Sequence, residues 1–406
     1  MQSNQETIPL HEKEQREKTR KTLLVLGILL IAINLRTPIT TLGPLVGTIR
    51  NDLHFSGTLA GFLTTLPLLA FAAISPFVSK WSRKYGVELV LFLALISITL
   101  GNLIRPLGNI SILLFGTLLI GIGIAAGNVL IPSVIKKEFP FKLGLMTGVY
   151  SIFMNLIAAT ASGLATPIAR NKHFGWQGTL WLFGTISIIA LIVWSLQLRH
   201  NCMEKKNTKN LHAAHKSIWK SPLAWQVTVF MGAQSAIFYV SVAWLPNILA
   251  EQGIDLVTGG IVLSILQFSV MPITFIMPII AGKMKNQIFL VILTTVLWLI
   301  GLGGIMMETG NLVIVIIAAI LYGVAGGSAF SLSMMFFSLR TRTAQQSADL
   351  SGMAQSIGYL IAAICPTLFG ALHDWSGSYA VTMWLLVAVV ILLFFFGLGA
   401  ARDKKL

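Results

Sequence analysis

The sequence predicts an all-α integral membrane protein that crosses the bilayer with twelve helices. Hydrophobic residues make up 55% of the 406 residues and only 11% are charged, whereas a soluble domain carries roughly 25% charged residues. The mean hydropathy is +0.81. Apolar stretches recur along the whole chain, and a helix needs about 20 such residues to cross the hydrocarbon core.

The predicted spans follow one another with short polar connections. They cover 22–49, 57–79, 87–106, 110–135, 142–169, 176–198, 223–250, 257–281, 287–307, 311–338, 346–371 and 378–401. The expected kink sites are prolines inside these stretches: Pro38, Pro44, Pro67, Pro76, Pro272 and Pro278.

Polar segments divide the chain into a tail, two halves and a linker. The tail 1–21 is followed by no small-residue cleavage site, so we expect it to be retained in the cytosol. The longest polar interior segment, 200–222, separates the six spans of 22–199 from the six of 223–401. Residues 402–406 form a short second tail.

Basic residues distinguish the two sides of the membrane. Alternate connections carry Lys80, Arg83, Lys84, Lys136, Lys137, Lys142, Arg199, Lys205, Lys206, Lys209, Lys216, Lys220, Lys283, Lys285, Arg340 and Arg342. The other connections carry Arg50, Arg105, Arg170 and Lys172. The positive-inside rule therefore predicts that both termini are cytoplasmic, and we expect the plasma membrane as the location. This asymmetry accounts for the net charge of +15, so no nucleic-acid partner is expected.

Cys202 and Cys365 are expected as free thiols.

The two halves of the chain repeat one another at an offset of about 200 residues. Leu-Ile-Ala-Ala occurs at 156–159 and again at 360–363, and the small residues at 123, 125 and 127 match those at 323, 325 and 327. This spacing predicts a parallel duplication into two six-helix bundles, which is the architecture of major facilitator transporters. Two such bundles rock about a central site that opens to one side at a time. We expect a monomer in the lipid bilayer.

Arg36 lies inside the first apolar stretch and is the strongest functional indication in the sequence. A cation at that depth costs several kcal/mol unless it faces protein, water or a negative partner. It therefore predicts a polar cavity that meets a small, electron-rich substrate. The alternative is a structural or gating role, with Arg36 bonded to backbone carbonyls.

Other polar and aromatic side chains are candidates to line the same cavity. They are Thr40, Asn128, Tyr150, Asn155, Gln234, Phe238, Tyr239, Gln267, Gln355 and Tyr359. The amides can donate and accept hydrogen bonds, and the rings can stack on a planar or heteroaromatic compound. For each of them, a bond between helices is the alternative role.

The distribution of charged residues limits the transport mechanisms that we expect. No Asp or Glu falls deep within a predicted span, although proton-coupled transporters generally carry a titratable relay there. We therefore expect facilitated diffusion, exchange, or movement of a proton on a weakly acidic substrate. The sequence contains no nucleotide-binding loop, metal-ligand cluster or catalytic constellation. It predicts a transporter without a cofactor rather than an enzyme.

Several motifs resemble one branch of the major facilitator superfamily. They read NLRTPIT at 34–40, GPL at 43–45, GIAAGNVLIP at 123–132, GWQG at 175–178, AWLP at 243–246 and LSGMAQSIGY at 350–359. These segments resemble the cyanate/2-nitroimidazole permease family. The resemblance implies the major facilitator fold and transport of a small anion or a small polar or heteroaromatic compound.

One segment departs from the wider superfamily. The connection after the second span usually carries an acidic residue, but here 76–86 reads PFVSKWSRKYG. This difference puts in doubt the charge-pair latch that the connection normally supplies.

Two other functions stay open at this point. Efflux of hydrophobic drugs is one, but it favours an intramembrane carboxylate rather than a lone cation. A transporter-like membrane sensor is the other, but it usually adds a long regulatory segment. The direction of transport, the cargo and its stoichiometry are not predicted.

Overall fold

The computed structural model describes residues 10–171, 173–200, 218–308 and 310–406, and these are almost entirely helical. Within these ranges, twelve helical stretches are long and apolar enough to cross a membrane. The predicted spans are therefore confirmed as helices. The predicted linker 200–222 falls largely on 201–217, which lies outside the described residues, as does Cys202.

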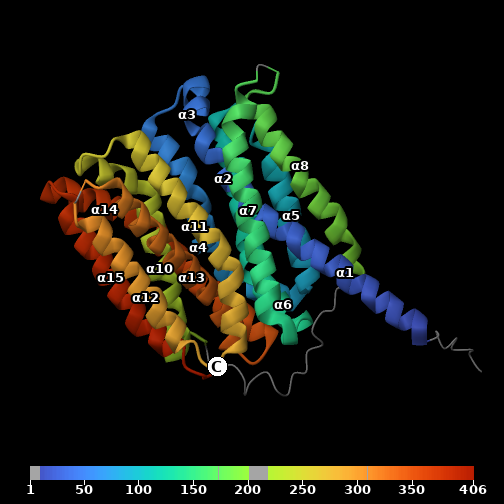
Figure 1. Cartoon of the computed structure of the whole chain (residues 1–406). Coiled ribbons are helices and arrows are strands. Elements are labelled where there is room, and N and C mark those ends of the chain that lie inside the picture. Colours follow the sequence, from blue (N-terminus) through green and yellow to red (C-terminus); the bar gives the residue numbers. More distant parts are fainter. Residues whose placement is uncertain (1–9, 172, 201–217, 309) are drawn as a thin grey trace, which may run out of the picture.

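The helices of the two halves form two groups that lie side by side (Figure 1). The first half contains α1 (Leu10–Asn34), α2 (Thr37–Thr40), α3 (Leu42–Leu53), α4 (Gly57–Tyr85), α5 (Val87–Ile104), α6 (Ile110–Glu138), α7 (Leu143–Ala169) and α8 (Gly175–Ser195). The second half contains α10 (Pro222–Glu251), α11 (Leu256–Lys283), α12 (Ile288–Met306), α13 (Leu312–Leu339), α14 (Ala344–Ser376) and α15 (Tyr379–Ala400). Short 3₁₀ helices are η1 (Pro140–Lys142), η2 (Leu196–His200) and η3 (Ile218–Lys220).

Polar caps and small residues explain where these helices begin and how closely they pack. Ser56, Asn109 and Asp255 each accept a hydrogen bond from a backbone N–H in the first turn of the helix that follows. Gly123 on α6 faces the Ala94 carbonyl on α5, where an added methyl group would collide. Such small residues let membrane helices approach closely.

The first span is interrupted, which confirms the kink expected at Pro38 and divides the predicted stretch 22–49 into α1, α2 and α3. Helix α1 ends at Asn34, and the backbone at Arg36 has φ −131° and ψ −39°. The physical reason is Pro38, which has no N–H to donate to the carbonyl of Asn34 and whose ring crowds that carbonyl. Arg36 therefore stands at a break between α1 and α2, near the middle of the first span.

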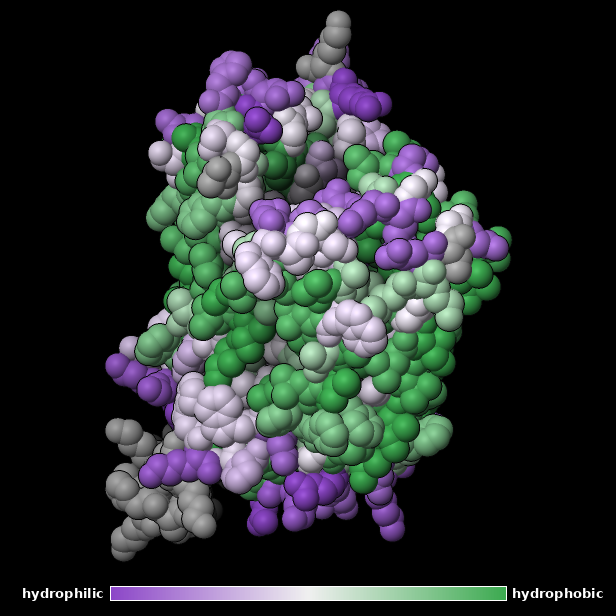
Figure 2. Space-filling model, turned by 90° about the vertical axis from the view of Figure 1, so that its left-hand side faces the viewer, coloured by the Kyte–Doolittle hydropathy of each residue, from purple (hydrophilic) through white to green (hydrophobic). Residues whose placement is uncertain are grey.

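On the side of the molecule shown in Figure 2, an apolar belt lies between two hydrophilic ends. We call one end the basic face; it carries the exposed residues Lys80, Lys84, Lys142 and Lys283 and the C-terminus. We call the other end the opposite face; it carries α3 and the connection between α7 and α8 (Figure 1). The belt is the surface expected of a protein that spans a bilayer.

Helices from the two halves touch near the basic face. Helix α7 packs on α11, where Gly144 faces the Pro278 carbonyl and Gly148 faces the Phe275 carbonyl. Helix α4 packs on α14, where the Ser356 hydroxyl donates to the Ala72 carbonyl at 2.6 Å. Gly144 and Gly148 lie in the first two turns of α7, close to the basic face, so the structure is closed on that side, and the bond from Ser356 to Ala72 extends the contact to the middle of α4.

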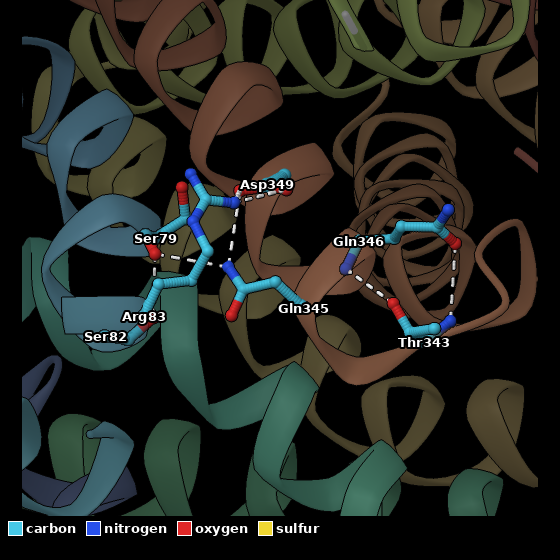
Figure 3. Close-up of polar contacts among 7 residues, drawn as sticks. All are labelled: Ser79, Ser82, Arg83, Thr343, Gln345, Gln346 and Asp349. Carbon is cyan, nitrogen blue, oxygen red and sulfur yellow. Dashed lines mark hydrogen bonds and ion pairs between the residues drawn. The ribbon is translucent and has the colours of Figure 1, made fainter. Parts of the chain in front are cut away.

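Polar bonds reinforce this closure (Figure 3). Arg83 on α4 lies 2.9 and 3.0 Å from the two carboxylate oxygens of Asp349 on α14. The Gln345 amide donates to the Ser79 carbonyl at 3.2 Å. The Thr343 and Gln346 side chains cap the start of α14 themselves. A charge-pair latch is therefore present although the acidic residue of the usual signature is missing.

Toward the opposite face, the molecule is open between its halves. Figure 2 shows the surface hollowed near this upper end. A Cβ added at Gly61 on α4, or at Gly260 on α11, would meet no other heavy atom within 4 Å. The structure thus has one closed end and one open end.

Candidate functional site

Arg36 lies between the two halves rather than in the lipid-facing surface. Its Nη1 donates a hydrogen bond to Oδ1 of Asn155 on α7, in the first half. Its guanidinium carbon lies 5.6 Å from the centre of the Phe238 ring on α10, in the second half. The side chain is partly exposed, and it lies between residues of the two halves.

The Asn155 amide is held so that its oxygen faces Arg36. Its nitrogen donates to the carbonyl of Ser151 at 2.8 Å, one turn earlier on α7, so its oxygen is free to accept from the guanidinium. An amide is neutral and leaves the charge of Arg36 in place. Among the described residues, no carboxylate lies within 4 Å of the Arg36 guanidinium.

Aromatic side chains from several helices surround this charge. Tyr150 on α7, Tyr239 on α10 and Tyr359 on α14 all lie within electrostatic range of Arg36. The Phe238 and Tyr239 rings contact each other at 5.4 Å and keep some exposure, whereas Tyr150 and Tyr359 are buried. Phe238, Tyr239 and Tyr359 lie near the middle of their helices, and Tyr150 lies in the third turn of α7, so the site is remote from both ends of α10 and α14.

Three further candidates are Thr40, Gln355 and Asn128, the last of which contributes its backbone carbonyl. The Thr40 hydroxyl lies 3.1 Å from the Ala158 carbonyl on α7, so Thr40 ties α2 to α7. The Gln355 amide nitrogen donates at 3.0 Å to the carbonyl of Asn128 and at 2.7 Å to Ser351. The bond between Gln355 and Asn128 crosses from α14 to α6 and so joins the two halves.

The remaining two candidates are placed differently. Gln234 is buried, and its amide bonds to Met231 and Ser235 within α10. Gln267 is exposed on α11, next to Leu266, whose carbonyl packs against Gly323 on α13. Neither has a contact with Arg36 or its partners among the bonds described, so their role as ligands stays a prediction.

The sequence pattern did not single out two residues of this region. Phe71 on α4 contacts Tyr359 edge to face, with ring centres 4.9 Å apart. Arg105, at the end of α5, is 1% exposed and donates from Nη1 to the carbonyl of Pro38 at 2.8 Å. Phe71 could not be told from other apolar residues of its helix, and Arg105 resembled an ordinary loop charge.

A separate cavity of about 140 Å³ lies near the basic face, away from Arg36. Its charged lining residues are all paired: Arg20 with Glu138 at 3.0 Å, Lys137 with Glu88 at 3.9 Å, and Arg83 with Asp349 outside the cavity at 2.9 Å. Because these charged side chains are paired within the protein, we assign the cavity a structural role. The candidate substrate site therefore remains the Arg36 centre.

A central polar site between two helical bundles, open at one end only, defines a transporter of the major facilitator class. The family model described as Major Facilitator Superfamily matches residues 24–363, and the chain belongs to this family. The proton:xylose symporter XylE, in a structure bound to 6-bromo-6-deoxy-D-glucose, superposes with a TM-score of 0.75 at 13% identity. The match covers 95% of this chain and 97% of that chain, and it shows the shared fold.

Sequence relatives place the chain in a particular branch of that family. The uncharacterized transporter YycB of Bacillus subtilis is 43% identical, over 96% of each chain. The 2-nitroimidazole transporter of Escherichia coli is 38% identical, over 95% of this chain and 97% of that protein. The cyanate transport protein CynX of Escherichia coli is 26% identical, over 88% of this chain and 91% of that protein. The resemblance to the cyanate/2-nitroimidazole permease family is therefore confirmed, and the chain is a small-molecule transporter that works by alternating access.

Proposed function

We propose that this transporter carries a planar small anion or a small polar heteroaromatic compound, and that Arg36 is its recognition centre. The observation that carries the proposal is the arrangement of Arg36 itself. It lies at mid-membrane depth, it is bonded to a neutral amide, and it faces the Phe238 ring across the space between the halves.

The chemistry of the guanidinium supports this substrate class. Its planar fork of donors matches the two oxygens of a carboxylate, and a nitro group presents two oxygens in a similar geometry. A negative partner would also offset the cost of holding an unneutralised charge at this depth. Aromatic rings beside the guanidinium favour a substrate with a π-system of its own. The names of the 2-nitroimidazole and cyanate relatives agree with a small, planar cargo.

We further propose that the basic face is cytoplasmic and that the chain works as a monomer in the plasma membrane. The exposed lysines that define this face, with the beginning of α1 and the C-terminus at the same end (Figure 1), agree with the positive-inside rule. On this assignment, the structure is closed to the cytoplasm and open to the outside. An external substrate would then reach Arg36 through the hollow.

The absence of carboxylates from the described surroundings of Arg36 also bears on coupling. A drug exporter for organic cations would favour a negative charge in this place, so multidrug efflux is the weaker alternative. Facilitated diffusion, exchange, or entry of a proton on a weakly acidic substrate fits a site with one fixed cation. We propose one of these modes rather than a protein-borne proton relay.

A binding screen tests the substrate class directly. Purified protein is heated with 2-nitroimidazole, cyanate, 4-hydroxybenzoate or a neutral sugar, because a ligand that binds the folded state raises its melting temperature. We expect a shift with at least one of the first three and none with the sugar. The shift should disappear in Arg36→Ala and persist in the matched control Arg170→Ala, an exposed arginine at the end of α7. An equal shift in Arg36→Ala would contradict the proposal.

A further inference from the structure

Arg105 is a buried cation without an obvious duty. It lies at the end of α5 in the first half and is 1% exposed. Among the described residues, no carboxylate lies within 4 Å of its guanidinium, and its Nε has no hydrogen-bond partner. Burying a charged group without a counter-charge costs free energy, so we expect this arginine to have a specific function.

The contact that Arg105 does make is with the interrupted segment that carries Arg36. Its Nη1 donates to the carbonyl of Pro38 at 2.8 Å, two residues beyond Arg36. Breaks in a membrane helix free backbone groups that neighbouring side chains must satisfy. The neighbouring helix α6 makes room for Arg105 with Gly116, where a Cβ would lie 2.9 Å from the Arg105 backbone.

Two other side chains hold the same segment from other directions. The Asn34 amide donates to the carbonyl of Leu30 at 2.8 Å and to that of Ile186 on α8 at 3.4 Å. Thr40 bonds to the Ala158 carbonyl on α7. The break is thus fixed against α8 by Asn34, against α7 by Thr40 and against α5 by Arg105. Of the three, Arg105 alone contributes a charged donor, and such bonds are roughly twice as strong as neutral ones.

We propose that Arg105 is a positioning residue for the Arg36 site. It holds the Pro38 carbonyl and so sets the direction from which Arg36 reaches Asn155 and the space between the halves. A binding group must be held within about 0.5 Å of its productive position, and supporting hydrogen bonds provide this. The proposal rests on the proposed function of Arg36, but the position of residue 36 can be measured without any substrate.

The functional test compares Arg105→Gln and Arg105→Lys with the exposed control Arg170→Gln in proteoliposomes. The probe is radiolabelled 2-nitroimidazole. We expect Arg105→Gln to raise KM at least tenfold while the maximal rate per folded protein stays within twofold. Arg105→Lys, which keeps a charged donor, should recover at least half of the loss on a logarithmic scale. Equal KM values in all three variants, or a loss of maximal rate without a change in KM, would overturn the proposal.

A second measurement separates the two proposals. Cys202 and Cys365 are replaced by Ser, Arg36→Cys is introduced, and its rate of reaction with a charged methanethiosulfonate reagent is measured. We expect the rate to change at least threefold when Arg105→Gln is added, to change less with Arg105→Lys and to stay constant with Arg170→Gln. Unchanged rates with both Arg105 variants would overturn the positioning role. If unaltered protein does not transport 2-nitroimidazole, that choice of substrate fails, and the labelling rates alone decide on Arg105.

Discussion

The Arg36 side chain combines a fixed position with an unneutralised charge. Its partner Asn155 is held by a bond to Ser151, and the Phe238 ring faces it from the other half of the molecule. A purely structural arginine would be expected to use its donors on backbone carbonyls, as Arg105 does with Pro38. The difference between these two arginines supports recognition at one and positioning at the other.

The shape of the guanidinium gives a first prediction at the scale of residues. Arg36→Lys keeps the charge and loses the planar fork, so affinity for a planar anion such as 4-hydroxybenzoate should fall at least tenfold. Affinity for the smaller cyanate should fall less, because a single donor can still meet it. Isothermal titration of the purified variants measures both constants. Equal losses for the two anions would show that the fork does not select the substrate.

Asn155→Asp separates recognition from a structural role. The new carboxylate has the size of the amide and places a counter-charge against Arg36, so it would compete with an anionic substrate. We expect uptake of the anion to fall at least tenfold, with little change in melting temperature, because the ion pair gained with Arg36 offsets the lost bond to the Ser151 carbonyl. If Arg36 only held the helices together, the stronger ion pair would leave uptake intact. Uptake of the anion is measured at a single pH, with the surface substitution Asn171→Asp as the control. The result decides between a recognition role and a purely structural role for Arg36.

At the scale of elements, two features of the helices shape the mechanism. Pro38 causes α1 to end at Asn34, and the short segment that follows carries Arg36 at the break between α1 and α2. Glycines on α7 let its backbone touch that of α11, where Gly144 and Gly148 face the carbonyls of Pro278 and Phe275. The first feature builds the site, and the second lets the halves close on one side of it.

The contact between α7 and α11 predicts a variant that cannot close. A leucine at Gly144 would collide with the Pro278 carbonyl, so Gly144→Leu should hold the basic face open and abolish net transport. The matched control is Gly163→Leu on the same helix, where a Cβ meets no heavy atom within 4 Å. Reaction of cysteines placed on the inner surface of α11 with a membrane-impermeant reagent reports the open state. Normal transport by Gly144→Leu would show that this contact is not required.

At the scale of the whole molecule, hydropathy and charge were sufficient for the twelve spans, because each follows from local composition. The duplicated halves and the place of Arg36, Asn155, Phe238 and Tyr359 in one centre were also predicted. What the sequence did not show depends on contacts between distant segments. The bond from Arg105 to Pro38 and the latch of Arg83 with Asp349 join residues that no local pattern pairs, whereas the kink at Pro38 follows from the proline itself.

The latch between Arg83 and Asp349 joins the two halves on the closed side, so it should bias the equilibrium between the two end states. Both side chains are partly exposed, at 26% and 17%, and a pair of this kind contributes about 1 kcal/mol or less. Asp349→Asn should therefore raise the population open at the basic face by up to about fivefold without abolishing transport. Spin labels at Lys142→Cys and Lys283→Cys, on exposed ends of the two halves, report the change as a longer distance.

Restoring the pair in reverse gives the decisive comparison. The double variant Arg83→Asp with Asp349→Arg can form the same ion pair between α4 and α14, so its distance distribution should return toward that of the unaltered protein. Asp403→Asn, an exposed carboxylate on the same face, controls for the change in net charge. A shift in that control as large as in Asp349→Asn would attribute the effect to overall charge. Because Thr343 and Gln346 cap α14 independently of the pair, the helix itself should be unaffected, and the measurement then reports the balance between the closed and open ends.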